Sequence, residues 1–150
     1  MSQNAHSYRK LKIAGVVALA LVVALLGFAG NFLFDFALNP QAPYTMKMMQ
    51  DGKDAGKGEQ MDAEEIEARA WFKQNRESSS LTAADGTELA AWYFAALEST
   101  HDYAVCLHGY TNEPIGMARY VKRFHDRGMN VLAPAARAHE RSGGDYIGMG

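Results

Sequence analysis

This sequence contains little cysteine and has no excess of positive charge. The 150 residues contain one cysteine, Cys106, so no disulfide can form within the chain. The formal net charge is -2 and the pI is near 6.2, whereas a nucleic-acid-binding protein needs a basic face or stripe. No internal repeat is visible at any period. We therefore expect one modest domain with appendages that binds no nucleic acid.

A long uncharged run stands near the N-terminus. Ile13 to Gly30 carries no charged residue, and a stretch of roughly 18 apolar residues reaches the length that crosses a hydrocarbon core. A cleaved signal peptide is the alternative, although its apolar region is normally shorter, roughly 7 to 15 residues. Basic residues precede the run and favour a cytoplasmic N-terminus. The sequence predicts a cytoplasmic basic tail at residues 1–12, a transmembrane helix at residues 13–34 within the lipid bilayer of the cell membrane, and an extracytoplasmic domain.

The composition changes sharply after the apolar run. Asn39 to Gln60 contains two prolines and three glycines and shows no apolar periodicity, which is typical of a loop or stalk. Residues 35–60 are therefore predicted to be a linker that separates the domain from the bilayer.

An amphipathic helix is predicted to follow the linker. Asp62 is a suitable N-cap residue, and Glu65 three residues later completes the pattern of a capping box. Helical spacing places Ile66, Ala70 and Trp71 on one face. We expect that face to pack against the rest of the domain, which spans residues 61–150.

Strand patterns dominate the remaining sequence, with one further helix among them. The expected strands cover residues 80–83, 89–94, 103–107 and 130–133. Asp85-Gly86 suits a tight turn between the first two, and residues 114–127 begin with proline and repeat apolar residues at helical spacing. The third strand is apolar without alternation, as expected of a parallel strand covered on both faces. Strand, helix and strand in succession form a crossover unit of a parallel sheet, so the predicted fold class is α/β.

His108, Gly109 and Tyr110 follow the third strand directly. Ligands of open parallel sheets bind at the carboxyl ends of the strands. Glycine permits a sharp turn and a close approach by a ligand, so the Tyr110 amide could stabilise a developing negative charge. In the alternative interpretation, His108 only bonds neighbouring loops and Gly109 only makes a turn.

The order of these motifs carries a resemblance to a known family. The motifs occur in this order along the chain: Asp-Gly between two strands, an apolar strand, HGYT, a proline-initiated helix, RGMNVLAP, an R-x-H-x-x-S loop and YIGMG. This order resembles the first half of the α/β-hydrolase fold, and more narrowly the membrane-anchored bacterial cell-surface hydrolases, which also share the N-terminal span and a segment like LNPQAP. The resemblance implies that the backbone N–H of Tyr110 contributes to an oxyanion hole. It also implies that His108, Gly109 and Thr111 shape that loop.

A second loop completes the resemblance but departs from the family pattern. The family usually reads D-x-R-G-H-G-x-S, whereas residues 135–142 here read AARAHERS, with the aspartate and both glycines replaced. Arg137, His139 and Ser142 remain, and the resemblance implies that they support the site. The His139-Glu140 pair does not form a zinc-binding HExxH motif, because Gly143 stands where the second histidine would be. No metal or cofactor is expected.

The motif that would carry the nucleophile is missing from these residues. The family places a Ser in G-x-S-x-G after a further helix and the acid and base later still, and no such motif occurs here. The resemblance thus implies a membrane-anchored serine hydrolase of small-molecule esters or amides, represented by an N-terminal half that is inactive alone. It also implies that the third strand has an open edge. The alternative is a non-catalytic, membrane-anchored binding module.

Overall fold

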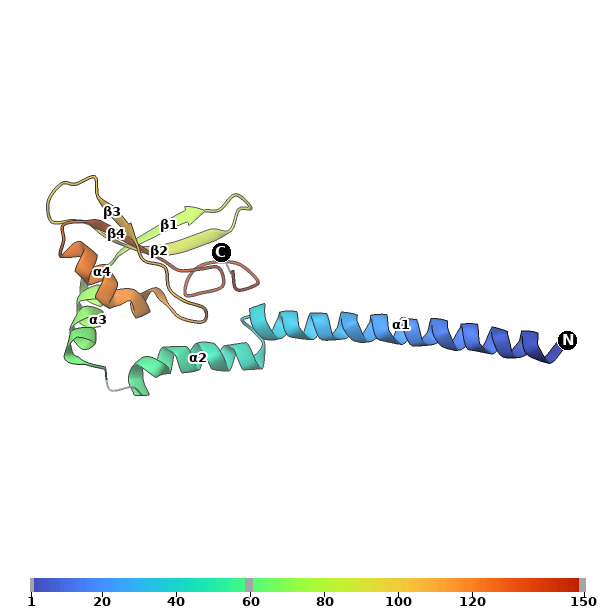
Figure 1. The fold of residues 1–150 in the computed structure, drawn as a ribbon. Coiled ribbons are helices and arrows are strands. Elements are labelled where there is room, and N and C mark those ends of the chain that lie inside the picture. Colours follow the sequence, from blue (N-terminus) through green and yellow to red (C-terminus); the bar gives the residue numbers. More distant parts are fainter. Residues whose placement is uncertain (1, 59–60, 149–150) are drawn as a thin grey trace. The chain divides into compact units, whose positions relative to one another are not determined.

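The computed structural model describes residues 2–58 and 61–148 (Figure 1). The chain divides into two compact units, Met1–Ala37 and Leu38–Gly150. The first contains nearly all of one helix, and the second contains the sheet with its helices.

Helix α1 (Ser2–Leu38) includes the whole of the predicted apolar span. Among the described residues it is the one helix that is long and apolar enough, by length and composition, to cross a membrane. Its large apolar side chains from Leu11 to Phe36 are exposed. The helix extends at both ends beyond residues 13–34, so most of the predicted basic tail is also helical.

Helix α2 (Pro43–Gly58) occupies most of the segment for which a loop was predicted. That prediction is wrong over this range. Proline at the first helical position has the required backbone angle and loses no hydrogen bond, and the Met46 N–H donates to Ala42 C=O at 2.8 Å. Thr45 is fully buried, so tertiary packing stabilises a helix that weak apolar periodicity did not reveal.

The sheet has four strands in the order β1-β2-β4-β3. They are β1 (Glu77–Thr82), β2 (Glu88–Phe94), β3 (Tyr103–Val105) and β4 (Asn130–Pro134). β1 and β2 form an antiparallel hairpin with Ser79 opposite Ala91, β2 and β4 are antiparallel, and β3 and β4 are parallel with Val105 opposite Leu132. The predicted α/β class and all four strands are confirmed, with ends that differ by up to three residues.

Local sequence signals explain the turns and helix ends. Gly86 has a φ of +84° in the β1–β2 turn, and Gly128 has a φ of +81° where the second predicted helix ends; glycine adopts these values without strain. That helix starts as a 3-10 turn (Pro114–Met117) and continues as α4 (Ala118–His125). The Asp62 side chain caps α3 (Ala63–Asn75) by accepting the Glu65 N–H at 2.8 Å, as predicted.

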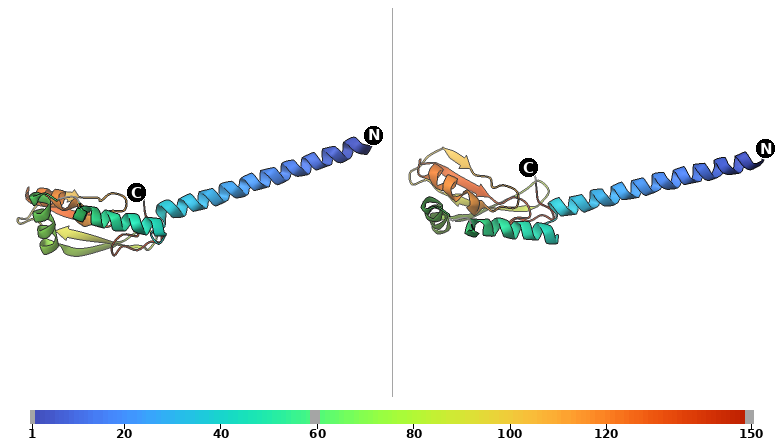
Figure 2. Two further views of the ribbon diagram at one scale, coloured as in Figure 1. Left: turned by 90° about the horizontal axis from the view of Figure 1, so that it is seen from below. Right: turned by 60° about the horizontal axis from the view of Figure 1, so that its bottom comes forward.

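The core lies between one face of the sheet and the helices α3 and α4, which lie side by side (Figure 2). Phe72 of α3 packs against Phe94 of β2, with ring centroids 4.8 Å apart. Ala68 and Phe72 therefore form the buried face of α3, and Ile66 is 55% exposed. Of the predicted face, Trp71 does pack against the core, with its ring centroid 5.2 Å from that of Phe94. The prediction is wrong for Ile66 and Ala70, which are exposed. Ion pairs accompany this packing, because carboxylates at the N-terminal end of α3 contact Arg119 and Arg123 of α4.

β3 is covered on one face rather than on both. Cys106 just after the strand is buried, whereas Tyr103, Val105 and Leu107 are 66%, 60% and 69% exposed. Side chains of a strand alternate between faces, and within the described residues α3 and α4 cover only the face of Cys106. Residues 103–107 show no alternation of apolar and polar residues, and the burial of this strand on both faces, which was predicted from that pattern, is wrong.

Candidate functional site

The loops after β3 and β4 lie next to each other because these two strands are parallel neighbours. The pairing continues one residue past β3, where the Cys106 N–H donates to Leu132 C=O at 2.8 Å. His108 then connects the loops. Its Nε2 accepts the Ala136 N–H at 3.0 Å, and its Nδ1 lies 2.9 Å from Gly109 C=O. Because a backbone N–H can only donate, Nε2 is the acceptor and Nδ1 carries the proton. The neutral ring therefore links the two loops through these contacts, and we call this link the His108 brace.

The turn after His108 obtains its shape from Thr111 rather than from Gly109. Thr111 is 8% exposed and has a φ of +57°, and the Asn112 N–H donates to Gly109 C=O at 3.1 Å. Gly109 has no left-handed φ, and a Cβ added there would meet nothing within 4 Å. Gly109 is therefore the first residue of this turn and needs no φ that is special to glycine, and the open space beside it leaves room for a ligand. Tyr110 is 42% exposed between these two residues.

The loop after β4 is held to the sheet by Ser142. Its hydroxyl accepts the Ala90 N–H and donates to Ala135 C=O, both at 2.8 Å. These two bonds join the loop to β2 and to the end of β4. The Ser142 hydroxyl therefore has a structural role, because both of its hydrogen bonds hold the loop to the sheet.

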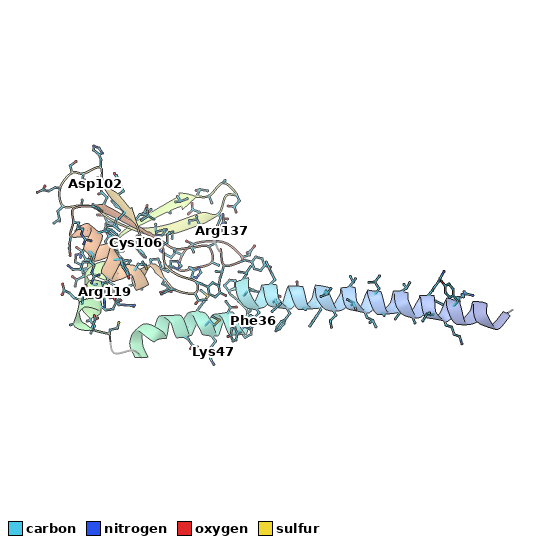
Figure 3. All side chains as sticks on the ribbon, in the orientation of Figure 1. Phe36, Lys47, Asp102, Cys106, Arg119 and Arg137 are labelled. Carbon is cyan, nitrogen blue, oxygen red and sulfur yellow. The ribbon has the colours of Figure 1, made fainter. Side chains whose placement is uncertain are left out.

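Arg137 ties the same loop to the β1–β2 turn, and its side chain is labelled in Figure 3. Its guanidinium contacts the Asp85 carboxylate at 2.9 Å and the Thr87 hydroxyl at 2.7 Å. The Thr87 backbone N–H, and after it Arg137, lower the pKa of Asp85 from 3.8 to about 2, because both favour the charged carboxylate.

His139 is the most buried of the predicted site residues, at 1% exposure. Its Nδ1 lies 2.9 Å from Arg137 C=O, and its ring centroid is 4.8 Å from that of His108. The residues on either side of it, Ala138 and Glu140, have φ values of +59° and +45°. These are the positions at which the resembled family has glycine. The loop keeps the backbone conformation that glycine would adopt freely, and the two replacements therefore strain it.

Sequence reasoning missed a cluster around Trp92. The Trp92 indole N–H donates to the Glu140 carboxylate at 2.9 Å, and the guanidinium carbons of Arg76 and Arg141 lie 4.2 and 4.4 Å from the ring centroid. Partial burial raises the pKa of Glu140, since desolvation disfavours the charged form. Trp92 and Glu140 are 48 positions apart, so no local pattern could have indicated their contact.

A mostly apolar cavity of about 360 Å³ opens between the two loops. Its polar lining groups are already bonded, since His108 contacts backbone groups and Arg137 contacts Asp85. The cavity is thus suited to an apolar group. Its lining consists of Leu89, Leu107, His108, Pro134, Ala135, Ala136, Arg137 and Gly148. His108 and Arg137 both line the cavity, and the His139 ring is tilted by 55° against that of His108. Tyr110, Thr111 and Ser142 are in the same loops but do not line it. In the described part of the chain, no three His, Cys, Asp or Glu side chains are grouped to hold a metal ion.

No family model matches this chain, and no curated protein matches it. Among solved structures, three crystal forms of the esterase Pf2001 of Pyrococcus furiosus match, with 30%, 29% and 30% sequence identity and TM-scores of 0.44, 0.45 and 0.44. About half of this chain is similar to an esterase. The matches cover 47%, 48% and 47% of this chain, which spans 28% of the esterase's length.

Proposed function

We propose that these residues form the oxyanion-loop part of a membrane-anchored serine hydrolase that cleaves esters or amides. The observation that supports the proposal is the His108 brace, which holds the loops of two adjacent parallel strands together at their carboxyl ends. Tyr110 stands one residue beyond that braced His-Gly pair. The motif order discussed above assigns its backbone N–H to the developing oxyanion, where preorganised donors lower the barrier to acyl transfer.

The proposal assigns the nucleophile, acid and base to residues other than these 150, because the sequence contains no G-x-S-x-G. The serines of β1 lie on an exposed edge strand, and the Ser142 hydroxyl holds its loop to β2 and β4. We therefore expect the chain alone neither to hydrolyse aryl esters nor to react with a fluorophosphonate probe. Stoichiometric labelling that disappears when one serine is changed to alanine would overturn this assignment.

The oxyanion role is tested by two variants at one position, in a longer polypeptide that carries these residues and a downstream G-x-S-x-G. Tyr110→Pro removes the backbone N–H, whereas Tyr110→Phe retains it. Loss of one oxyanion donor costs about 10²- to 10³-fold in kcat, so Tyr110→Pro should show that loss and Tyr110→Phe should not. A folded Tyr110→Pro protein with unchanged kcat would refute the role.

Topology is tested separately from chemistry. The basic residues before the apolar run of α1 favour a cytoplasmic N-terminus, so protease added to intact cells should digest the domain. A domain that is digested only after lysis would have the opposite orientation.

A non-catalytic, membrane-anchored binding module is the second candidate. It is favoured by the lining of the 360 Å³ cavity, which contains no serine or cysteine. Such a module would bind an apolar ligand without turnover even when the chain is extended. Turnover by the longer polypeptide distinguishes the two functions.

A further inference from the structure

The loop after β4 is hydrogen-bonded to the last residue of α1. The Ile147 N–H donates to Leu38 C=O at 2.8 Å, and the Ile147 side chain is 3% exposed. Leu38 ends α1 and is also the first residue of the compact unit that contains the sheet. The contact therefore lies within that unit, and it holds Ile147 beside the residue at which the long apolar helix ends.

The residues around Ile147 connect this contact to the cavity between the loops after β3 and β4. Gly148 lines the cavity, as does Arg137. A Cβ built on Gly148 would lie 3.5 Å from the Arg137 Cβ, and a Cβ built on Gly144 would lie 3.2 Å from the same atom. The loop thus packs closely on the stem of Arg137. A continuous series of short contacts joins the end of α1 to the wall of the cavity.

Helix geometry gives the expected depth of Leu38 at the membrane. The predicted span ends at residue 34, and α1 continues without a break to Leu38. Four residues at about 1.5 Å each carry the helix about 6 Å beyond the hydrocarbon core. The head-group layer on each side of a bilayer is about 5–8 Å thick. Leu38 and the neighbouring Ile147 are therefore expected at the level of the lipid head groups.

The cavity has the size and lining of a site for a hydrocarbon chain. Its volume is about 360 Å³ and its lining is mostly apolar, as in pockets that bind apolar groups. Leu89 of β2 and Pro134 of β4 form two of its sides. Both strands lie inward of β3 in the sheet, so a sheet extended beyond β3 keeps these two sides. Lipid chains are the most concentrated apolar groups near the head-group level.

We propose that this cavity takes up an acyl chain of a membrane lipid, which enters from the bilayer that anchors α1. His108 lines the cavity and Tyr110 is two residues further along the loop, so the carbonyl end of a bound chain lies near the proposed oxyanion donor. The substrate class is then a lipid ester or amide, whose hydrolysis consumes one water and releases a carboxylic acid and an alcohol or amine. This inference rests on the membrane anchor of the proposed function, and chain binding itself does not require the serine chemistry.

Photo-crosslinking of the full chain in nanodiscs tests the inference. The probe is a phosphatidylcholine with a diazirine near the end of one acyl chain, and mass spectrometry maps the adducts. We expect adducts on α1 and on residues that line the cavity. Leu89→Trp fills the cavity and should lower the cavity adducts several-fold without changing those on α1. Leu97→Trp is the matched control, because Leu97 is 91% exposed and does not line the cavity.

Two variants at Ile147 test whether the bilayer is the source of the chain. Ile147→Pro removes the N–H that Leu38 accepts, whereas Ile147→Val retains it. Lipid adducts in the cavity should fall several-fold in the first variant and not in the second. A free diazirine fatty acid, added to the full chain in detergent, should label the cavity equally in both, which also shows that Ile147→Pro leaves the cavity intact.

The outcomes separate this inference from the proposed function. Adducts on α1 with none in the cavity would overturn the inference and leave the hydrolase proposal standing. Cavity labelling by the free fatty acid alone, or equal lipid labelling of the two Ile147 variants, would also overturn it. An unlabelled α1 would refute the membrane anchor and the inference together. Lipid adducts in the cavity of a longer polypeptide that shows no turnover would support the inference and refute the hydrolase.

Discussion

The helix-covered core and the loop cluster at the carboxyl ends of β3 and β4 are stabilised by different interactions. The core is apolar, and its large side chains, such as Phe72, Phe94 and Val121, are fully buried. The loops are held by hydrogen bonds and an ion pair, and they contain backbone strain at Ala138 and Glu140. The core therefore determines whether the domain folds, whereas the polar contacts determine the shape of the loops. Strain tends to collect at functional sites because the surrounding structure must impose it.

The largest expected effect is in the core. Phe94→Ala removes a ring that is 1% exposed and packs against Phe72 and Trp71, and such changes lower the free energy of unfolding by about 3–5 kcal/mol. Urea unfolding in detergent, followed by tryptophan fluorescence, measures it. The exposed Leu97→Ala should stay within about 0.5 kcal/mol of wild type. A cost for Phe94→Ala as small as that of Leu97→Ala would contradict the assignment of the core.

The next effect is at the brace between the loops. His108→Ala removes the acceptor of the half-buried Ala136 N–H, and loss of such a hydrogen bond costs about 0.5–1.5 kcal/mol. Urea unfolding should show this loss, and hydrogen exchange should be faster at Ala136. His101→Ala, an exposed histidine at the other end of β3, is the control. Equal protection of Ala136 in both variants would show that His108 does not brace the loop.

A smaller effect of opposite sign is expected from the strained loop. A non-glycine residue in the left-handed region costs about 1–2 kcal/mol, so Ala138→Gly should raise the free energy of unfolding, by about 0.5–1 kcal/mol after the entropy of glycine is included. Ala84→Gly, in a turn without positive φ, should lower it by about 0.4–1 kcal/mol. Destabilisation by both variants would argue against strain at Ala138.

The smallest effect is a pH dependence at the Asp85–Arg137 contact. The pKa of Asp85 is lowered to about 2 in the folded protein, so its stabilising contribution is present above the ordinary value of 3.8 and is lost as the pH falls toward 2. The difference in unfolding midpoint between wild type and Asp85→Asn should therefore shrink between pH 5 and pH 2. Asp145→Asn, at an exposed carboxylate, controls for general acid effects. A difference that does not change with pH would contradict the contact.

Signals that act within a few residues predicted their structures correctly. The Asp62 cap, the Asp85-Gly86 turn and the proline at the start of the 3-10 turn before α4 all appear where the sequence places them. Predictions that depended on distant partners were less successful. The buried face of α3 and the helix α2 were missed because Phe94 and the packing around Thr45 decide them.

The candidate site shows the same division. The sequence located the loop after β3 and the histidines near it, because His-Gly directly follows an apolar strand. It did not reveal that Thr111 rather than Gly109 has the positive φ, or that His108 accepts the Ala136 N–H. Both depend on how the two loops meet, and the roles of Tyr110, Thr111, Arg137, His139 and Ser142 in a reaction stay predictions.

By itself, the sequence determined the apolar run of α1, the strand segments and their turns, and the order of motifs, because these follow from composition and from contacts between near neighbours in the chain. Only the tertiary structure decided which face of β3 is buried and which loops share a cavity. Side-chain burial in a strand depends on what packs against it, and the pairing of β3 with β4 joins residues more than 25 positions apart. No local pattern contains that information.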